Sequence, residues 1–455
     1  MDLDEKTLLE LAEKIFYAAE PPMKEYASSK LLQDYLRQAG FKVEAGVADM
    51  PTAFIATWGK GSPVIGFLAE FDALEGLSQK PVPYKDPIEP NAAGHGCGHN
   101  LFGVASAGGA VAMKKAMERE KSAGTIKVFG TPAEEICVGK PYMAKAGLFN
   151  GLDAIFVWHP EYETSAGYGA ALAYDSIKFS FKGQAAYGAQ PWMARSALDA
   201  VILMEVIVNF LKEHMVEPEA RPTVNSIIKS GEAPSVIPAA AEIWYVFRTM
   251  TRAYSERIYE HLLRAAKAAA LATGTEVDVF RVTGCHQQIP NKTISEAMHQ
   301  FLLEVGPPQF TAEEQAFAKK IQREYGVKEL GLDATIKEPY QQGAFYADDR
   351  SEPSWFAPMA ALHMANWPLG VPAHSWGAVA VSGHSIGYKC MVVAAKVFSK
   401  TALYLIKQPE ILKKAREELE ERTIRQGFVF KSPIPDGQKP PWPKAETIVQ
   451  TSKTQ

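Results

Sequence analysis

The sequence predicts an α/β protein in which a mainly parallel-sheet domain is interrupted by a ferredoxin-like α+β domain. Two observations lead to this prediction. In the first third of the chain, short apolar runs alternate with helical segments, and after residue 174 the order changes to β-α-β-β-α-β. The length of 455 residues also exceeds what one compact core usually holds, so we expect more than one domain.

Residues 1–174 form the first part of the larger domain in this interpretation. Apolar residues at helical spacing predict the two N-terminal helices, and Gly40 stands where the second should stop. Short apolar runs that end in glycine or charged residues predict buried strands with helices between them. The expected helices cover residues 8–17, 28–39, 101–119 and 140–146, and the expected strands cover 41–44, 53–58, 64–69, 125–129 and 154–158.

Residues 175–290 form the inserted domain, and residues 291–455 return to the larger one. The insert is expected to hold strands at 176–181, 223–228, 241–248 and 276–282 and helices at 196–212 and 253–271. After it we expect a helix at 312–324 and a return to the first domain over 377–402. Five prolines between positions 433 and 443 predict an extended C-terminal tail on the surface.

Composition excludes several classes of protein. Lys and Arg total 48 against 52 Asp and Glu, a net charge of −4, so we expect neither a nucleic-acid nor a membrane-surface partner. The apolar segment 197–211 contains charged residues and is too short to span a bilayer. The N-terminal residues lack the pattern of a signal peptide. The four cysteines are scattered, unlike those of a disulfide-stapled domain, so we expect a cytoplasmic protein.

The most informative motif is GHGCGHN at residues 94–100. Cys97 and His99 can turn toward one ion because the three glycines let the backbone fold closely, and thiolate with imidazole suits zinc or a similar divalent metal. The alternative is a glycine-rich turn with a buried cysteine and a capping histidine.

Further polar residues follow the carboxyl ends of predicted strands. They are Asp72, the pair Glu134 and Glu135, and His159. Ligands bind at this edge of an open α/β sheet, so these side chains can converge with Cys97 although they are distant in sequence. We assign Glu135 to metal binding, and Glu134 to proton transfer between an attacking water and the leaving nitrogen.

Taken together, these motifs resemble the aminoacylase and carboxypeptidase-like co-catalytic metallohydrolases, and within them the aminobenzoyl-glutamate hydrolase B-type amidohydrolases. The resemblance runs from about residue 8 to about residue 402 through FLAEFDAL, GHGCGHN, TPAEE, the His after AIFVW, GQAAYGAQPWMARSALDA and GHSIGYKCMVVAAK. It implies a metallohydrolase domain, a lid that also forms a homodimer, and one or two divalent ions, zinc or manganese. It also implies metal ligands at Cys97, His99, Glu135 and His159, a catalytic Glu134, and a supporting role behind the ligands for Asp72.

The chain departs from the family pattern at two places. Tyr187 stands where the family usually has a lid histidine that stabilises the oxyanion across the dimer. A phenol donates one hydrogen bond but carries no positive charge, so this stabilisation should be weaker or directed at another group. The second departure is Tyr388, which stands where the close branch of the family has the histidine that serves as its last ligand. More distant relatives place this ligand in a His-Ser pair like His384-Ser385, so we expect it at His384, with Tyr388 as the weaker candidate.

Four other residues are candidates with open alternatives. His95 either orients a ligand or caps a turn, and His374 either lines the cleft or fills its wall. By the resemblance, Asn225 and Arg248 help to hold a substrate carboxylate, which Arg grips in bidentate fashion. An ordinary structural salt bridge is the other explanation for Arg248.

The expected function is hydrolysis of the amide C–N bond of an N-acyl or N-aroyl amino acid of the aminobenzoyl-glutamate kind. Because both departures introduce tyrosine, hydrolytic deamination of an activated aromatic amine, such as a nitroanthranilate, is the alternative. A third possibility is an inactive relative that acts as a binding subunit.

Overall fold

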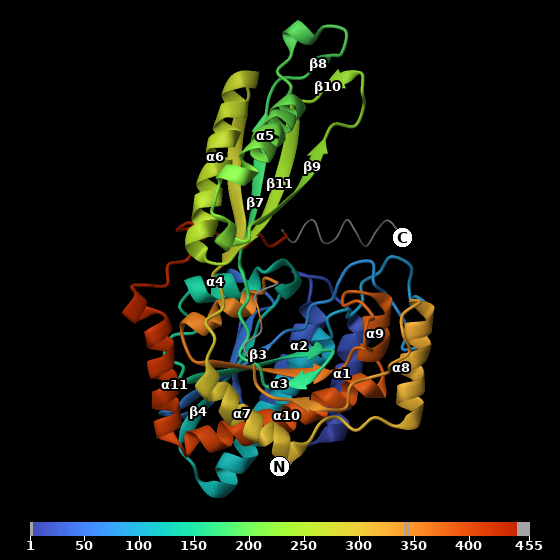
Figure 1. The fold of residues 1–455 in the computed structure, drawn as a ribbon, viewed down its shortest axis with the longest axis vertical. Helices are drawn as coiled ribbons and strands as arrows, with labels where there is room; N and C mark the ends of the chain where they lie inside the picture. Colours follow the sequence, from blue (N-terminus) through green and yellow to red (C-terminus); the bar gives the residue numbers. More distant parts are fainter. Residues whose placement is uncertain (1–2, 341–342, 344–345, 444–455) are drawn as a thin grey trace.

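A mixed eight-stranded sheet forms the centre of the larger part of the molecule (Figure 1). The computed structural model describes residues 3–340, 343 and 346–443. The strand order is β1-β2-β4-β3-β5-β14-β6-β13, and the central four strands β4, β3, β5 and β14 run parallel. The bounds are β1 (Lys42–Ala45), β2 (Phe54–Lys60), β3 (Val64–Ala69), β4 (Gly124–Gly130), β5 (Ala154–Glu161), β6 (Thr164–Ser165), β13 (Ile336–Lys337) and β14 (Met359–Ala365). The predicted mainly parallel sheet is therefore confirmed.

Helices cover this sheet because its central strands are apolar on both faces. The longest two, α3 and α10, pack against each other, and α3 also lies against β3. The helices of this part are α1 (Glu5–Ala18), α2 (Tyr26–Gln38), α3 (His99–Glu120), α4 (Gly139–Lys145), α7 (Lys292–Val305), α8 (Ala312–Glu324), α9 (Trp376–Ser382), α10 (Ser385–Ile406) and α11 (Pro409–Arg422).

Three features of this part differ from the sequence prediction. The buried strand β14 lies in the region that Pro, Gly and Trp residues mark as irregular, and α7 and α11 are additional helices. The segment 377–402, expected only as a return to the first domain, is built of two helices, because the chain bends at Gly383 and His384 between α9 and α10.

The inserted part is a four-stranded antiparallel sheet in the order β12-β7-β11-β9, the arrangement expected of a β-α-β-β-α-β unit. Its elements are β7 (Ala173–Lys182), α5 (Ala197–Leu211), β9 (Thr223–Ser230), β11 (Ala240–Thr249), α6 (Arg252–Thr273) and β12 (Glu276–Cys285). It has its own core, in which Phe179, Met204 and Leu262 are buried. We keep 175–290 as the proposed extent of this domain and call it the lid.

The lid projects from the larger part, which we call the catalytic domain (Figure 1). At the far end, two short strands, β8 (Ala186–Tyr187) and β10 (Val236–Ile237), pair with each other. At the near end, the C-terminal tail crosses the base of the lid, where Arg281 Nη1 donates to the carbonyl of Pro433 at 2.6 Å. The tail also reaches α2, since Trp442 Nε1 donates to Tyr26 Oη at 3.3 Å. Among the described residues, no helix combines the length and hydropathy required to cross a membrane.

Candidate active site

Cys97 and His99 are held at the start of α3 by a tight turn. Gly98 lies between them with φ +76°, and a Cβ there would meet Pro160 Cγ at 2.8 Å. Only glycine fits this combination of backbone conformation and close approach. The turn therefore delivers both side chains to the same end of the helix.

His159 meets Cys97 from the carboxyl end of β5. Its Nε2 lies 3.0 Å from Cys97 Sγ, although the two residues are 62 positions apart. Its Nδ1 donates to the carbonyl of Pro160 at 2.6 Å, which leaves Nε2 as the ligand atom.

Asp72 holds two ligands in place. His99 Nδ1 donates to Asp72 Oδ1 at 2.9 Å, so His99 also presents Nε2 to the site. The other Asp72 oxygen accepts from the backbone N–H of Glu135 at 3.0 Å. A carboxylate behind a metal-binding histidine fixes its tautomer and orientation. Asp72 therefore lies directly behind His99 and against the backbone of Glu135.

His374 lies beside Glu135, in the turn before α9. Its Nε2 is 3.6 Å from Glu135 Oε2, and its backbone N–H donates to the carbonyl of Gly96 at 3.3 Å. The sequence prediction treated His374 as a wall or substrate residue, but the structure brings it to the ligand cluster.

Two groups of potential metal ligands share Cys97. Cys97, His99 and His159 form one, and Cys97, Glu135 and His374 form the other, with the ligand atoms of each group within 4.8 Å of one another. The donor set of thiolate, imidazole and carboxylate suits zinc and similar divalent ions. His99 Nε2 and Glu135 Oε1 are buried and make no hydrogen bond, although carboxylate oxygens of Glu70 and Glu134 lie 3.2 and 3.6 Å from His99 Nε2. Buried polar atoms normally make one, so these two atoms are suited to bind a cation.

The pKa values of these groups reflect burial among carboxylates. Burial raises the pKa of Glu135 to about 8, and burial followed by Glu135 and Glu134 raises the pKa of the Cys97 thiol well above its usual value. Burial lowers the pKa of His159 well below its usual value, which keeps the imidazole neutral and able to bind a metal. Divalent ions would favour the charged carboxylate and thiolate.

Glu134 lies next to the ligands on a short 3₁₀ turn, η2 (Glu134–Ile136). Its Oε2 is 3.6 Å from His99 Nε2. Ala133 and Cys137, which flank the turn, both have positive φ, an unfavourable conformation that is retained where the surrounding structure requires it. Burial, followed by the nearby carboxylate of Asp348, raises the pKa of Glu134 well above its usual value.

Beneath the ligands lies a buried layer of ion pairs, which we call the charged floor: Glu70, Lys140, Asp348, Asp349 and Arg350. Lys140 Nζ lies 2.8 Å from Glu70 Oε1 and also contacts Asp349. Arg350 pairs with Asp348 through Nε and Nη2. The floor is connected to the ligands, since Glu70 Oε2 is 3.2 Å from His99 Nε2.

A cavity of about 360 Å³ opens above this cluster. Arg248 of β11 brings the lid into its wall, and its Cζ lies 5.3 Å from the centre of the Tyr174 ring. No carboxylate of the described residues lies within ion-pair distance of Arg248. The remaining lining is Cys97, Glu134, Glu135, Cys137, His159, Glu161, Tyr162, Tyr346, Ala347, Asp348, Arg350, Trp367, Ala373 and His374.

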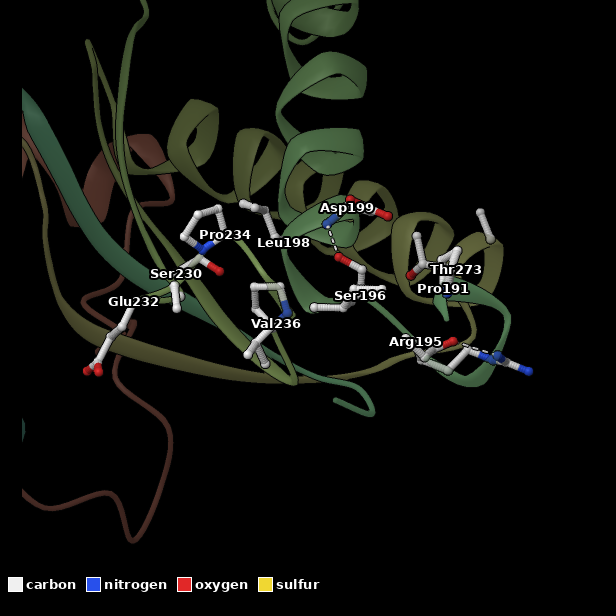
Figure 2. Close-up of a pocket in the computed structure, with 16 residues that line it drawn as sticks. Pro191, Arg195, Ser196, Leu198, Asp199, Ser230, Glu232, Pro234, Val236 and Thr273 are labelled. Carbon is white, nitrogen blue, oxygen red and sulfur yellow. Dashed lines mark hydrogen bonds between the residues drawn. The ribbon is translucent and has the colours of Figure 1, made fainter. Parts of the chain in front are cut away.

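A larger cavity, of about 810 Å³, lies in the lid between the start of α5 and the loop at 230–238 (Figure 2). Its lining contains no His or Cys, and two of its charged side chains, Arg195 and Glu232, lie at opposite ends of the view (Figure 2). Within the described chain, we therefore place the candidate active site at the smaller cavity.

Three predicted residues lie outside the cluster in the catalytic domain. His384 caps α10, and its ring stacks on Phe317 at 4.0 Å. Tyr388 lines a different cavity with Leu9 and Val392. His95 is buried, with Nε2 donating to the carbonyl of Ile15 at 3.0 Å, so it ties the glycine-rich loop to α1. His384 and Tyr388 lie outside the cluster because the chain bends at Gly383 and both residues follow this bend, His384 as the cap of α10 and Tyr388 within it.

Two predicted lid residues are also separate from it. Tyr187 lies in β8 at the tip of the lid and is 63% exposed. Asn225 lies on the exposed edge strand β9 and does not line the cavity.

The charged floor and Glu161 were not predicted from the sequence. One signal is present for the floor: the run Asp348-Asp349-Arg350 shortly before an apolar segment is unusual for a solvated loop. The ion pair between Lys140 and Glu70 has no such signal, because about 70 positions separate the two residues.

Comparisons with known proteins identify the family of the chain. The model of peptidase family M20/M25/M40 matches residues 66–424. A p-aminobenzoyl-glutamate hydrolase subunit of Escherichia coli (strain K12) is 33% identical, with 97% of each chain covered.

Solved structures share the fold. An aminobenzoyl-glutamate utilization protein from Klebsiella pneumoniae has a TM-score of 0.62 at 16% identity, covering 89% of this chain and 98% of that one. A Bacillus subtilis protein described as a dinuclear metal-binding peptidase of the M20 family has a TM-score of 0.56, also at 16% identity and with the same coverage. With the family model matching most of the chain and a relative aligned along nearly all of it, the protein belongs to peptidase family M20/M25/M40 and is a hydrolase of amide bonds.

Proposed function

We propose that the chain binds two divalent ions, zinc or manganese, and uses them to hydrolyse the amide bond of an N-acyl or N-aroyl amino acid. The observation that carries the proposal is the pair of ligand groups that share Cys97. His99 and His159 complete one group, and Glu135 and His374 complete the other. This assignment replaces His384 with His374 as the last ligand.

Ions in these positions would polarise the scissile carbonyl and make a water molecule acidic. Glu134 is the proton carrier: its carboxylate takes a proton from the attacking water and returns it to the leaving nitrogen. Its raised pKa suits the return of the proton to the leaving nitrogen, because a group that holds its proton too weakly cannot deliver it. The charged floor fixes Glu70 and Asp348 next to Glu134, so the local field is the same in each turnover.

Arg248 is the proposed contact for the substrate carboxylate. It enters the cavity from the lid and has no carboxylate partner among the described residues, so an acidic substrate group can pair with it. Tyr162, Tyr174 and Trp367 give the cavity an aromatic wall, which suits an aroyl group. The E. coli relative, named for p-aminobenzoyl-glutamate, supports the same substrate class.

Arylamine deamination is the less supported function. Tyrosines at two positions favour it in the sequence, but Tyr388 lies in another cavity, so only Tyr187 remains in its support. An inactive binding subunit is disfavoured by the complete ligand set around Cys97.

We also propose that two copies pair through the outer face of the lid. Ile202, Val206 and Phe210 form an exposed apolar stripe along α5, four residues apart, and Phe210 is 78% exposed. Beside it, β9 is an unpaired edge strand that exposes Ile227. The edge strand of an antiparallel sheet can pair with the same strand of a second copy. A second copy would therefore pair with β9 and also cover the apolar stripe on α5. Because the E. coli relative is named as a subunit, a mixed assembly is the contrasting outcome.

Pairing of this kind gives Tyr187 a role. At the tip of its own lid it is far from its own cluster in this structure (Figure 1), so we assign it to the cavity of the partner subunit. The four cysteines are unpaired, and a thiolate ligand requires reducing conditions, so we assign the protein to the cytoplasm.

The test combines metal analysis with an activity screen. Purified protein should contain close to two divalent ions per chain, and it should release amino acid and carboxylic acid from N-aroyl amino acids. Release of ammonia and a phenol from arylamines would favour the alternative. Protein that binds no divalent ion and gains no activity with zinc or manganese would refute the proposal. Light scattering reports whether the chain is a homodimer.

A further inference from the structure

Glu161 is the one carboxylate among the described lining residues of the active-site cavity that metal binding, proton transfer and the charged floor leave unused. It is the last residue of β5, and it lines the cavity together with His159. Alternate residues of a strand face the same side, so Glu161 points to the side of His159 from a position about 7 Å further along the strand.

The backbone around Glu161 is fixed. Its carbonyl accepts from the backbone N–H groups of Asn366 and Trp367, at 2.9 and 3.1 Å. Trp367 in turn stands between its neighbours, with ring centres 5.7 Å from His159 and 5.4 Å from Tyr162. The backbone from which the Glu161 side chain extends is therefore held in place beside His159.

No cation of the described chain neutralises Glu161 directly. The one positive group that acts electrostatically on Glu161 is Arg350, which already pairs with Asp348 through two nitrogens, and among the described residues no Lys, Arg or His nitrogen lies within ion-pair distance of the Glu161 carboxylate. Its surroundings otherwise supply the backbone N–H of Tyr162 and a second acid, Glu163. A half-buried carboxylate in a ligand cavity, with no cation to balance it, is matched by a donor on the ligand.

We infer that Glu161 determines specificity by selecting substrates whose acyl side carries a nitrogen that donates hydrogen bonds, either an amino group or an ammonium group. This inference rests on the proposed function. With the scissile carbonyl at the ligands, the distance along β5 from His159 to Glu161 is similar to the span of a benzoyl ring with its para substituent. Arg248 approaches from the lid and pairs with the substrate carboxylate, so the cavity recognises a carboxylate and a hydrogen-bond donor on the same substrate molecule.

Three N-aroyl amino acids that differ only at the para position test the inference: 4-aminomethylbenzoyl, 4-ethylbenzoyl and 4-carboxybenzoyl. The wild-type enzyme should have a kcat/KM at least tenfold higher for the aminomethyl compound than for the ethyl compound, because a hydrogen bond to a charged group contributes about 1.5–3 kcal/mol. Glu161→Gln should reduce this ratio to about twofold or less while its metal content stays near that of the wild type.

Two further variants complete the design. Glu163→Gln removes a neighbouring carboxylate that does not line the cavity and should keep the wild-type preference. Glu161→Lys should reverse it and favour the 4-carboxybenzoyl compound. Thermal melting and metal analysis confirm that each variant is folded and loaded.

These measurements distinguish failure of the inference about Glu161 from failure of the proposed amide hydrolysis. Equal kcat/KM for the aminomethyl and ethyl compounds in the wild type, or an unchanged ratio in Glu161→Gln, overturns the inference and leaves amide hydrolysis intact. Failure of the metal-loaded wild type to cleave any of the three overturns the proposed function and the inference with it.

Discussion

The charged floor of the catalytic domain and the outer face of the lid differ in whether their side chains find partners within the same chain. In the floor, Lys140 and Arg350 are buried and meet their carboxylates within the same chain. On the lid, Phe210 and Ile227 are exposed to solvent. In our proposal, one folded chain therefore completes the metal-binding half of the site, whereas the half that covers the substrate is left for a second copy to complete.

The most severe test of the catalytic half is Glu134→Gln. The amide keeps the shape of the side chain but cannot carry the proton, so turnover should fall by about 10²–10⁴-fold. Metal content and thermal stability should stay unchanged, measured by elemental analysis and melting curves. Glu44→Gln, at an exposed position on β1, is the control. Retained turnover in Glu134→Gln would remove Glu134 from the mechanism.

Lys140→Met tests whether the buried carboxylates of the charged floor depend on Lys140 as their cation. It leaves Glu70 and Asp349 buried without their shared cation, and breaking a buried pair in this way costs about 3–5 kcal/mol in the free energy of unfolding. Urea denaturation of the metal-loaded protein measures this change. Lys85→Met, at an exposed position, should have little effect, and adding Asp349→Asn to Lys140→Met should recover part of the loss. A Lys140→Met protein as stable as the wild type would contradict this account of the floor.

Arg248→Ala tests the contact between the two regions. Losing a hydrogen-bonded charge should lower kcat/KM for a substrate with a free carboxylate by about 1.5–3 kcal/mol, or roughly 10- to 150-fold. The corresponding carboxamide substrate should be affected much less. Steady-state kinetics on the two substrates gives the answer, and an equal loss on both would assign Arg248 a structural role.

Phe210→Asp tests whether the lid face is an interface between copies. A charge at the most exposed residue of the stripe should weaken the dimer at least tenfold, about 1.4 kcal/mol, measured by light scattering over a dilution series. Leu271→Asp is matched in chemistry, since Leu271 is 86% exposed on the other lid helix, and should leave the dimer intact. If both variants assemble like the wild type, the partner binds elsewhere.

The smallest expected effect is that of Tyr187→Phe. Removing one neutral hydrogen-bond donor should lower kcat by a few-fold, about 0.5–1.5 kcal/mol. Because Tyr187 is assigned to the partner's cavity, the loss should disappear when it is combined with Phe210→Asp, a non-additivity that kinetics of the double variant detects. A loss that simply adds to that of Phe210→Asp would place Tyr187 in the cavity of its own chain.

Much of this site was predictable because its ligands lie in short local patterns. The glycine-rich turn at Cys97 and the carboxyl ends of β3, β4 and β5 are local features, and parallel strands necessarily bring their carboxyl ends to one edge. Asp72, Cys97, His99, Glu135 and His159 therefore follow from this turn and these strand ends. The antiparallel lid was likewise visible in the order of its elements.

The choice between His374 and His384 was not predictable, because both stand in similar His-Ser contexts. It depends on β14, which runs alongside β5 so that the following turn places His374 against Gly96. The bend at Gly383 then turns His384 into the cap of α10. The sequence by itself determined which residue types and which strand ends carry the chemistry, since these are local. Only the tertiary structure decided which of the two histidines lies beside Glu135, the pairing of Lys140 with Glu70, and the position of Glu161 and Tyr187, because each depends on where distant segments pack.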